Sequence, residues 1–306
     1  MQDGVEVAVY RWDAAAQPRA VVQVAHGMGE YGQRYGRLAE ALTAAGYTVY
    51  ASDHRGHGET ATGPDDLGHF RDEAGWEALV DDLFRINQTI AERHPGLPRV
   101  LLGHSMGAIV VQDYLALHGD SLAGAVLSAA GGGRRLLAGA ASLIARFERM
   151  RLGPRVSSDL LQALSFGDFN KRFEPTRTEF DWLSADEAEV DAYIADPQCG
   201  VPITVQGWID VLHGVRRIDD PAQLGKIPET MPLYVMSGSL DPVGNATKGV
   251  TWLLERLKRA GAQRVTHRFY EGGRHEMFNE VNRTEVVADL VEWLDALFSS
   301  SAGAAA

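Results

Sequence analysis

Cysteine is nearly absent from this sequence, and so are the signals of export and membrane insertion. Cys199 is the single cysteine, which excludes an intrachain disulfide and a cysteine cluster for zinc and is typical of a reducing compartment. No apolar run approaches the roughly 18 residues that indicate a membrane-spanning helix. The first residues, Met1 to Gly4, lack the basic and apolar regions of a signal peptide. We therefore expect a cytoplasmic protein.

Positive charge is also in short supply. The 29 Lys and Arg residues face 41 Asp and Glu residues, so that the net charge is −12. Phosphate backbones and anionic lipid surfaces repel such a charge, which argues against nucleic acid as a partner and favours small neutral substrates. The length of 306 residues with 45% hydrophobic content fits one large α/β domain, or one domain with an insertion.

The most informative stretch that is present runs from Arg99 to Leu117. An apolar run there meets Gly103-His-Ser-Met-Gly107, and a helical pattern follows. Because glycine has no Cβ, these two glycines would let a strand and a helix approach closely at a sharp turn, with Ser105 exposed at its tip. The strand, turn and helix context indicates a nucleophilic serine, which the five residues alone would not.

Strand and helix patterns alternate along most of the chain, which predicts a largely parallel sheet of seven or eight strands with helices on both faces. The strand patterns cover residues 5–10, 19–24, 48–51, 100–102, 123–128, 233–236 and 265–270, and the main helical patterns cover 34–45, 76–93, 106–117, 248–260 and 284–297. Between Gly131 and Pro228 the pattern is helical without a strong strand. We therefore predict a core of residues 1–130 and 229–298, a helical cap of residues 131–228 and a disordered tail of residues 299–306.

Three reactive residues follow strand patterns, where an open α/β sheet gathers its catalytic groups. They are Ser105, Asp241 and His275, and their order along the chain is that of α/β-hydrolases. A serine hydroxyl attacks well only when an imidazole takes its proton, and a carboxylate must orient that imidazole. We therefore predict that Ser105 attacks, His275 transfers the proton and Asp241 orients His275.

The negative oxygen that develops in such a reaction needs two backbone N–H donors. One comes from the residue after the nucleophile, which is Met106. The other comes from the loop after an early strand, His26-Gly-Met-Gly, which indicates Met28.

Other side chains compete for these roles. His26, His54, His57 and His104 also lie in loops after strands and are interpreted as local hydrogen-bonding residues. Asp53, Asp210, Asp219 and Asp220 are alternative acids, but only Asp241 directly follows a strand between the serine and the histidine. Asp53, His54 and His57 could form a metal cluster, yet no third imidazole or thiolate is spaced to complete it. No metal and no cofactor are therefore expected.

The predicted cap is rich in apolar residues, of which Leu143, Ile144 and Phe147 are candidates to line an acyl-chain pocket. The alternative is that these side chains pack the cap onto the core. A substrate pocket of this kind would also allow transient contact of the cap with lipid.

Taken together, the motifs resemble those of the monoacylglycerol lipase and bacterial lysophospholipase group of α/β-hydrolases. The segments that carry the resemblance span nearly the whole chain: His26-Gly-Met-Gly-Glu30 with Tyr35, Asp53-His-Arg-Gly-His-Gly58, Gly103-His-Ser-Met-Gly107, Asp196-Pro-Gln-Cys199, Ser237-Gly-Ser-Leu-Asp241 and Tyr270-Glu-Gly-Gly-Arg-His275. The resemblance implies a serine ester hydrolase that acts on single-chain acyl esters without a metal or cofactor, with Met28 and Met106 as the oxyanion donors. Relatives have a further strand before the segment that begins here at Asp3, so one strand of the family's sheet is expected to be missing.

Two other functions remain open at this point. A serine peptidase or thioesterase could use the same groups, because they serve any acyl transfer. A peptidase would need acidic residues to hold a substrate amine, for which the candidates are Asp181, Asp186, Glu187 and Glu189. A non-catalytic binding protein on a hydrolase scaffold is the third possibility, although such proteins typically lose the triad.

Overall fold

A seven-stranded sheet runs through the part of the chain that the computed structural model describes, residues 1, 3–132 and 135–299. Its order is β1-β3-β2-β4-β5-β6-β7. β1 is antiparallel to β3 and all other neighbours are parallel. The strands are β1 (Val9–Trp12), β2 (Ala20–Ala25), β3 (Tyr47–Ser52), β4 (Arg99–His104), β5 (Gly124–Ser128), β6 (Leu233–Gly238) and β7 (Val265–Tyr270). The predicted α/β class is confirmed, with the smaller of the two expected strand numbers.

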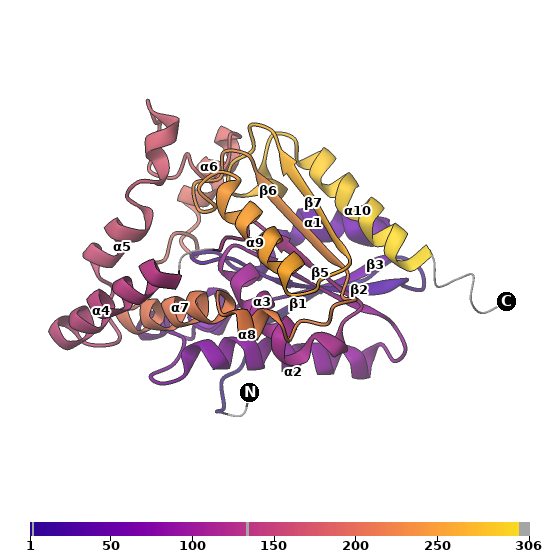
Figure 1. The fold of residues 1–306 in the computed structure, drawn as a ribbon, viewed down its shortest axis with the longest axis horizontal. Helices are drawn as coiled ribbons and strands as arrows, with labels where there is room; N and C mark the ends of the chain where they lie inside the picture. The colour runs from indigo at the N-terminus through magenta and orange to yellow at the C-terminus, as the bar shows by residue number, and fades with distance from the viewer. Residues whose placement is uncertain (2, 133–134, 300–306) are drawn as a thin grey trace.

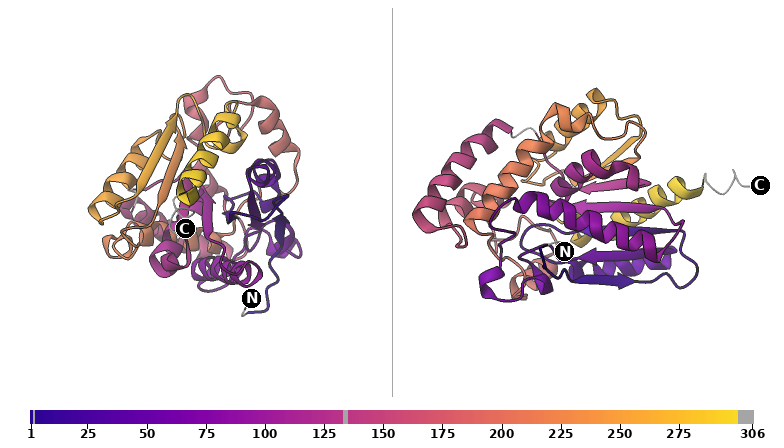
Figure 2. Two further views of the ribbon diagram at one scale, coloured as in Figure 1. Left: turned by 90° about the vertical axis from the view of Figure 1, so that its right-hand side faces the viewer. Right: turned by 90° about the horizontal axis from the view of Figure 1, so that it is seen from below.

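Helices cover both faces of this sheet, which is why its central strands are almost wholly apolar (Figure 2). α1 (Gly36–Ala44) and α10 (Arg283–Ser299) pack on one face, and α2 (Gly75–Arg93), α3 (Met106–His118) and α9 (Lys248–Arg259) pack on the other. Side chains of β4 alternate between the two layers: Val100 and Leu102 join the first, whereas Leu101 joins the second. Because β2 to β7 run parallel to one another, their carboxyl ends lie at the same edge of the sheet.

The first strand begins later than its sequence pattern indicates. Residues 5–8 precede β1, which starts at Val9. The N–H of Ala8 donates to the hydroxyl of Thr60 at 3.0 Å, so it is not available to a neighbouring strand. A side-chain acceptor has therefore taken the place of a strand partner at this position.

The described residues between β5 and β6, the segment predicted as a cap, form five α-helices. They are α4 (Arg135–Leu152), α5 (Asp159–Phe166), α6 (Glu187–Ala195), α7 (Val205–Ile218) and α8 (Pro221–Leu224). α7 contacts α2 and α3 of the core on one side and α4 on the other. Figure 1 shows α4 and α5 beyond one end of the sheet, farther from the core than α7. The exact domain boundaries stay a prediction.

Short 3₁₀ helices complete the described chain: η1 (Gly32–Tyr35), η2 (Gly58–Thr60), η3 (Pro64–Asp66), η4 (Gly119–Ser121), η5 (Phe169–Phe173) and η6 (Met277–Asn279). Within the described residues no helix is long and apolar enough to cross a membrane. The predicted disordered tail lies outside the described residues except for Ser299, which ends α10.

Candidate active site

Ser105 occupies the sharp turn between β4 and α3, as the sequence predicts. Its backbone angles, φ 53° and ψ −116°, are costly for a residue with a side chain. A Cβ at Gly103 would lie 2.5 Å from the carbonyl oxygen of Gly107, and a Cβ at Gly107 would lie 2.2 Å from that of Ala25. Only glycine therefore permits β2, β4 and α3 to approach this closely.

His275 and Asp241 are brought together from the ends of β7 and β6. The Nδ1–H of the His275 ring donates to Oδ1 of Asp241 at 2.9 Å, and both side chains are buried. Burial alone would lower the pKa of His275, but the Asp241 carboxylate outweighs it and raises that pKa above its usual value. With Nδ1 protonated, Nε2 is the nitrogen that can accept a proton.

The imidazole of His275 also lies near the serine turn. Its ring centre is 4.8 Å from that of His104, the residue before Ser105. The Ser105 hydroxyl has no hydrogen-bond partner within the described residues, and such contacts are often long before a substrate binds. The three predicted residues thus gather at one edge of the sheet, while their catalytic roles stay a prediction.

The loop after β2, residues 26–30, is called the Met28 loop below. Its neighbouring polar groups are occupied: the N–H of Gly27 donates to Oε1 of Glu30 at 2.6 Å, and that of Gly29 to Nε2 of His57 at 3.3 Å. In the described part of the chain the N–H groups of Met28 and Met106 have no acceptor. A Cβ on Gly27 would lie 3.3 Å from Cβ of Ser105, so this loop runs beside the serine. Two vacant donors near Ser105 suit a developing oxyanion.

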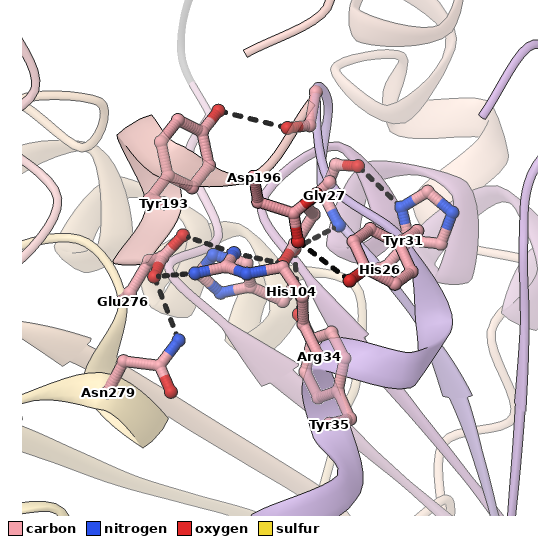
Figure 3. Close-up of polar contacts among 12 residues, drawn as sticks. His26, Gly27, Tyr31, Arg34, Tyr35, His104, Tyr193, Asp196, Glu276 and Asn279 are labelled. Atoms are coloured by element: carbon pink, nitrogen blue, oxygen red, sulfur yellow. Dashed lines mark hydrogen bonds and ion pairs between the residues drawn. The ribbon is translucent and has the colours of Figure 1, made fainter. Parts of the chain in front are cut away.

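Part of the predicted cap holds the Met28 loop in place (Figure 3). The Tyr193 hydroxyl donates to the carbonyl oxygen of Gly29 at 2.9 Å, and the N–H of Gly200 donates to the same oxygen at 2.8 Å. The Tyr31 hydroxyl donates to Asp196 at 2.7 Å. Residues 193–200 therefore belong to the surroundings of the candidate site.

Three buried histidines, His26, His54 and His57, form hydrogen bonds within or next to the Met28 loop. His26 donates from Nδ1 to the carbonyl of Gly27 and accepts at Nε2 from the N–H of His54. His57 donates from Nδ1 to the carbonyl of Arg55. Burial lowers the pKa of His54 to about 3 and that of His57 to about 4, and lowers that of His26 well below its usual value.

The metal-cluster alternative for Asp53, His54 and His57 does not fit this geometry. The Asp53 carboxylate accepts from the N–H groups of Gly32 and Glu59 and from the Tyr10 hydroxyl. Across the described ranges, no group of three or more potential ligand side chains could hold a metal ion.

These histidines give a specific expectation for stability against pH. Together with His104, whose pKa burial lowers to about 3, four histidines stay neutral in the folded protein at a pH where the unfolded chain, with a pKa near 6.5, is protonated. The stability is therefore fully present above pH 6.5 and decreases as the pH falls, by up to about 1.4 kcal/mol per pH unit for each group. His275, whose pKa is raised, opposes this trend, and so does Asp210, whose pKa burial raises to about 7. Burial lowers the pKa of His69, His94 and His118 as well, so the histidines with lowered pKa values are the larger group.

We expect Tm at pH 5 to lie at least about 10 °C below Tm at pH 7, measured by calorimetry. His57→Gln removes one titrating group and should reduce the slope, whereas His213→Gln, at an exposed site, should not. A Tm that does not change between pH 5 and pH 7 would contradict this account.

The alternative acids lie elsewhere in the described structure. Asp210 accepts from Gln206 within α7, Asp219 is 3.7 Å from Arg256, and Asp220 caps α8 by accepting from the N–H of Ala222. Asp241 is the carboxylate that contacts His275.

The acidic residues considered for a peptidase already have partners. Asp186 pairs with Arg283 at 2.7 Å, Glu189 with Arg37 at 2.7 Å and Glu187 with Arg177 at 3.8 Å. Asp181 accepts from the hydroxyl and N–H of Thr178. Asp181, Asp186 and Glu189 are therefore occupied by close partners, whereas Glu187 has one ion pair at 3.8 Å and its side chain is 79% exposed.

The cap residues Leu143, Ile144 and Phe147 lie on α4 and are 67%, 37% and 58% exposed. The buried face of this helix instead carries Ala138, Ser142, Ala145 and Glu148. The three apolar side chains therefore do not fasten the cap to the core, and their role in substrate binding stays a prediction.

Sequence reasoning missed Trp182, which covers the candidate histidine. Its ring centre lies 5.1 Å from that of His275, and its carbonyl oxygen accepts from the N–H of His275 at 3.4 Å. The N–H of Glu276 donates to the carbonyl of Leu183 at 2.8 Å. Nothing in the local sequence pattern indicates these long-range contacts.

A largely parallel sheet of this order, with a serine turn and an acid–histidine pair at its carboxyl edge, defines an α/β-hydrolase. A family model described as serine aminopeptidase, S33, matches residues 16–282. The chain belongs to this family.

Similar proteins agree with this assignment. Over 299 residues the chain is 30% identical to the monoacylglycerol lipase of Mycolicibacterium smegmatis, covering 95% of this chain and 93% of that protein. It is 29% identical over 280 residues to the human monoglyceride lipase, covering 91% and 82%. A thermostable carboxyl esterase from Bacillus coagulans, solved in complex with glycerol, has a TM-score of 0.88 at 28% identity, covering 95% and 94%. The resemblance found in the motifs is thereby confirmed.

Proposed function

We propose that this protein cleaves single-chain acyl esters, of the monoacylglycerol or lysophospholipid type, through an acyl-enzyme intermediate on Ser105. The coarser class, a carboxylic ester hydrolase, follows from the family and from relatives that are lipases and esterases. The observation that carries the mechanism is the buried His275–Asp241 hydrogen bond beside the strained Ser105 turn.

In the proposed reaction, Nε2 of His275 takes the proton of Ser105 as its oxygen attacks the ester carbonyl. Asp241 keeps the imidazole in the required tautomer and stabilises the imidazolium. The N–H groups of Met28 and Met106 stabilise the oxyanion. His275 then protonates the leaving alcohol, and water releases the acid by the reverse sequence.

We further propose that α4 contributes to the acyl-chain site and contacts lipid transiently. On a protein of net charge −12, this helix carries four arginines among its exposed apolar side chains, and its only acidic residue, Glu148, is buried. A basic, apolar helix face is typical of contact with a lipid surface. The arginines are Arg135, Arg146, Arg149 and Arg151, and the exposed apolar residues include Leu136, Leu137, Leu143, Phe147 and Met150.

A chain-length series of p-nitrophenyl esters tests this proposal. Each buried methylene contributes up to about 0.8 kcal/mol, so kcat/KM should increase several-fold per added pair of carbons until the pocket is filled. Asparagine at Leu143, Ile144 or Phe147 should flatten this increase and leave acetate almost unaffected.

Leu117→Asn, which changes an exposed leucine of α3, is the matched control and should leave the series unchanged. Activity that is highest on acetate and decreases with chain length in the unaltered protein would rule out a lipase-like pocket. Hydrolysis of amino-acid p-nitroanilides in preference to esters would favour the peptidase alternative.

A further inference from the structure

Arg34, in η1, is a buried cation that contacts three separate parts of the candidate site (Figure 3). Its side chain is 11% exposed. Nη1 lies 2.7 Å from Oε2 of Glu30, and the guanidinium donates two hydrogen bonds, of 2.8 and 2.9 Å, to the carboxylate of Glu276. Its Cζ is 5.0 Å from the ring centre of Tyr193, which belongs to the predicted cap.

Glu30 connects Arg34 to the Met28 loop. While Oε2 binds Arg34, Oε1 accepts from the N–H of Gly27 at 2.6 Å and from the Tyr35 hydroxyl at 2.9 Å. The hydrogen bond from Gly27 fixes the His26–Gly27 peptide, which directly precedes the Gly27–Met28 peptide that carries the Met28 N–H. The direction of the Met28 N–H therefore depends on where Glu30 is held.

Glu276 connects Arg34 to the loop of residues 271–276, called the His275 loop. It directly follows His275, and it also accepts from the side-chain amide of Asn279 at 2.8 Å. A shift of Glu276 would be passed directly to the backbone of His275. Arg34 thus joins the loop that offers the oxyanion donor to the loop that carries the proton-transfer group.

The positions of the Met28 loop and the His275 loop depend on the positive charge of Arg34. One guanidinium faces two buried carboxylates, Glu30 and Glu276. Although burial opposes it, Arg34 lowers the pKa of Glu276 to about 2, whereas burial raises the pKa of Glu30. Without the cation, the two carboxylates would have to separate or one would have to take a proton, and either change would displace a loop.

We propose that Arg34 is a positioning residue for ester hydrolysis, holding the Met28 loop and the His275 loop at the separation that the reaction requires. The inference rests on the function proposed above. Arg34 acts through its neighbours and need not touch the substrate. Its loss should therefore reduce kcat and leave KM largely unchanged, because misplacing a catalytic group by about 1 Å can cost about 10² in rate.

The test uses the full-length chain with p-nitrophenyl butyrate and a fluorophosphonate probe. Arg34→Met removes the charge and keeps most of the length; kcat should fall about 10²-fold with KM within about threefold of the unaltered value. The rate constant of fluorophosphonate labelling should fall in the same proportion, because labelling needs the same groups.

Arg37→Met is the matched control. Arg37 follows in α1 and pairs with Glu189 of α6 and Asn279 of η6, so it links similar elements without contacting Glu30 or Glu276. Its kcat should stay within about twofold of the unaltered chain. A kcat for Arg34→Met equal to that of Arg37→Met would overturn the inference.

Two milder substitutions keep the proposal testable if Arg34→Met does not fold. Arg34→Lys retains the charge without the two-pronged geometry and should recover roughly tenfold of the lost kcat. Glu276→Gln should cost about tenfold, and combining it with an Arg34 substitution should cost less than the product of the separate effects. If the loss of kcat in the double variant equalled the product of the two separate losses, Arg34 and Glu276 would not act through their mutual contact, which would contradict the proposal. An unaltered chain inactive on every ester would instead refute the proposed function.

Discussion

Replacing Ser105 by alanine should abolish ester turnover, with a loss of kcat on the order of 10⁶, and should remove all labelling by a fluorophosphonate. The reason is structural as well as chemical: Ser105 holds a backbone with φ 53° that places its side chain at the tip of the β4–α3 turn. We expect intact-mass spectrometry to detect one adduct on the unaltered chain and none on the variant.

Ser121→Ala is the control for this experiment. Ser121 ends η4 beyond the far end of α3, and its hydroxyl donates to the carbonyl of His118. This variant should label and turn over like the unaltered chain. Covalent labelling that persists in Ser105→Ala would refute the assignment of the nucleophile.

The histidine and its acid should give the next largest effects. His275→Ala should cost as much as the serine substitution, because the two residues act as one unit. Asp241→Asn should cost about 10⁴ in kcat, since an amide in place of the carboxylate at 2.9 Å from Nδ1 favours the wrong tautomer. Steady-state kinetics on p-nitrophenyl butyrate measure both.

Asp219→Asn and Asp220→Asn serve as controls for the acid, because Asp219 lies near Arg256 and Asp220 caps α8. Both should retain most of the activity. If Asp241→Asn were nearly silent and one of these were inactive, the acid would have to be reassigned.

Much of the fold could be predicted because its signals are local. The glycines around Ser105 and the continuous apolar runs of β4 and β6 indicate strands and a turn without reference to distant residues. The start of β1 could not be predicted in this way, because the alternating pattern of residues 5–10 does not reveal that the Thr60 hydroxyl takes the N–H of Ala8.

The residues of the candidate site likewise include some that local sequence signals predict and some that they do not. Ser105, Asp241 and His275 each follow a strand, so the rule that parallel strands end at one edge is sufficient to group them. Trp182 and Arg34 follow no such rule. Their contacts with the His275 loop join segments far apart in the chain, and such contacts depend on how the loops pack.

The hydrogen bonds between the helical insertion and the two loops have a consequence for how this enzyme can diversify. Residues 182–183 and 193–200 form hydrogen bonds to the backbones of His275, Glu276 and Gly29, so they help to hold the candidate catalytic centre. α4 and α5 contribute no hydrogen bond to either loop within the described residues. On the function proposed above, substitution or exchange of α4 would alter what the protein recognises without altering its chemistry. α5 has less freedom because its Phe166 stacks on Trp182, and residues 182–183 and 193–200 are held by their hydrogen bonds. On that proposal, the insertion consists of one part that can change with the substrate and one part that the reaction constrains.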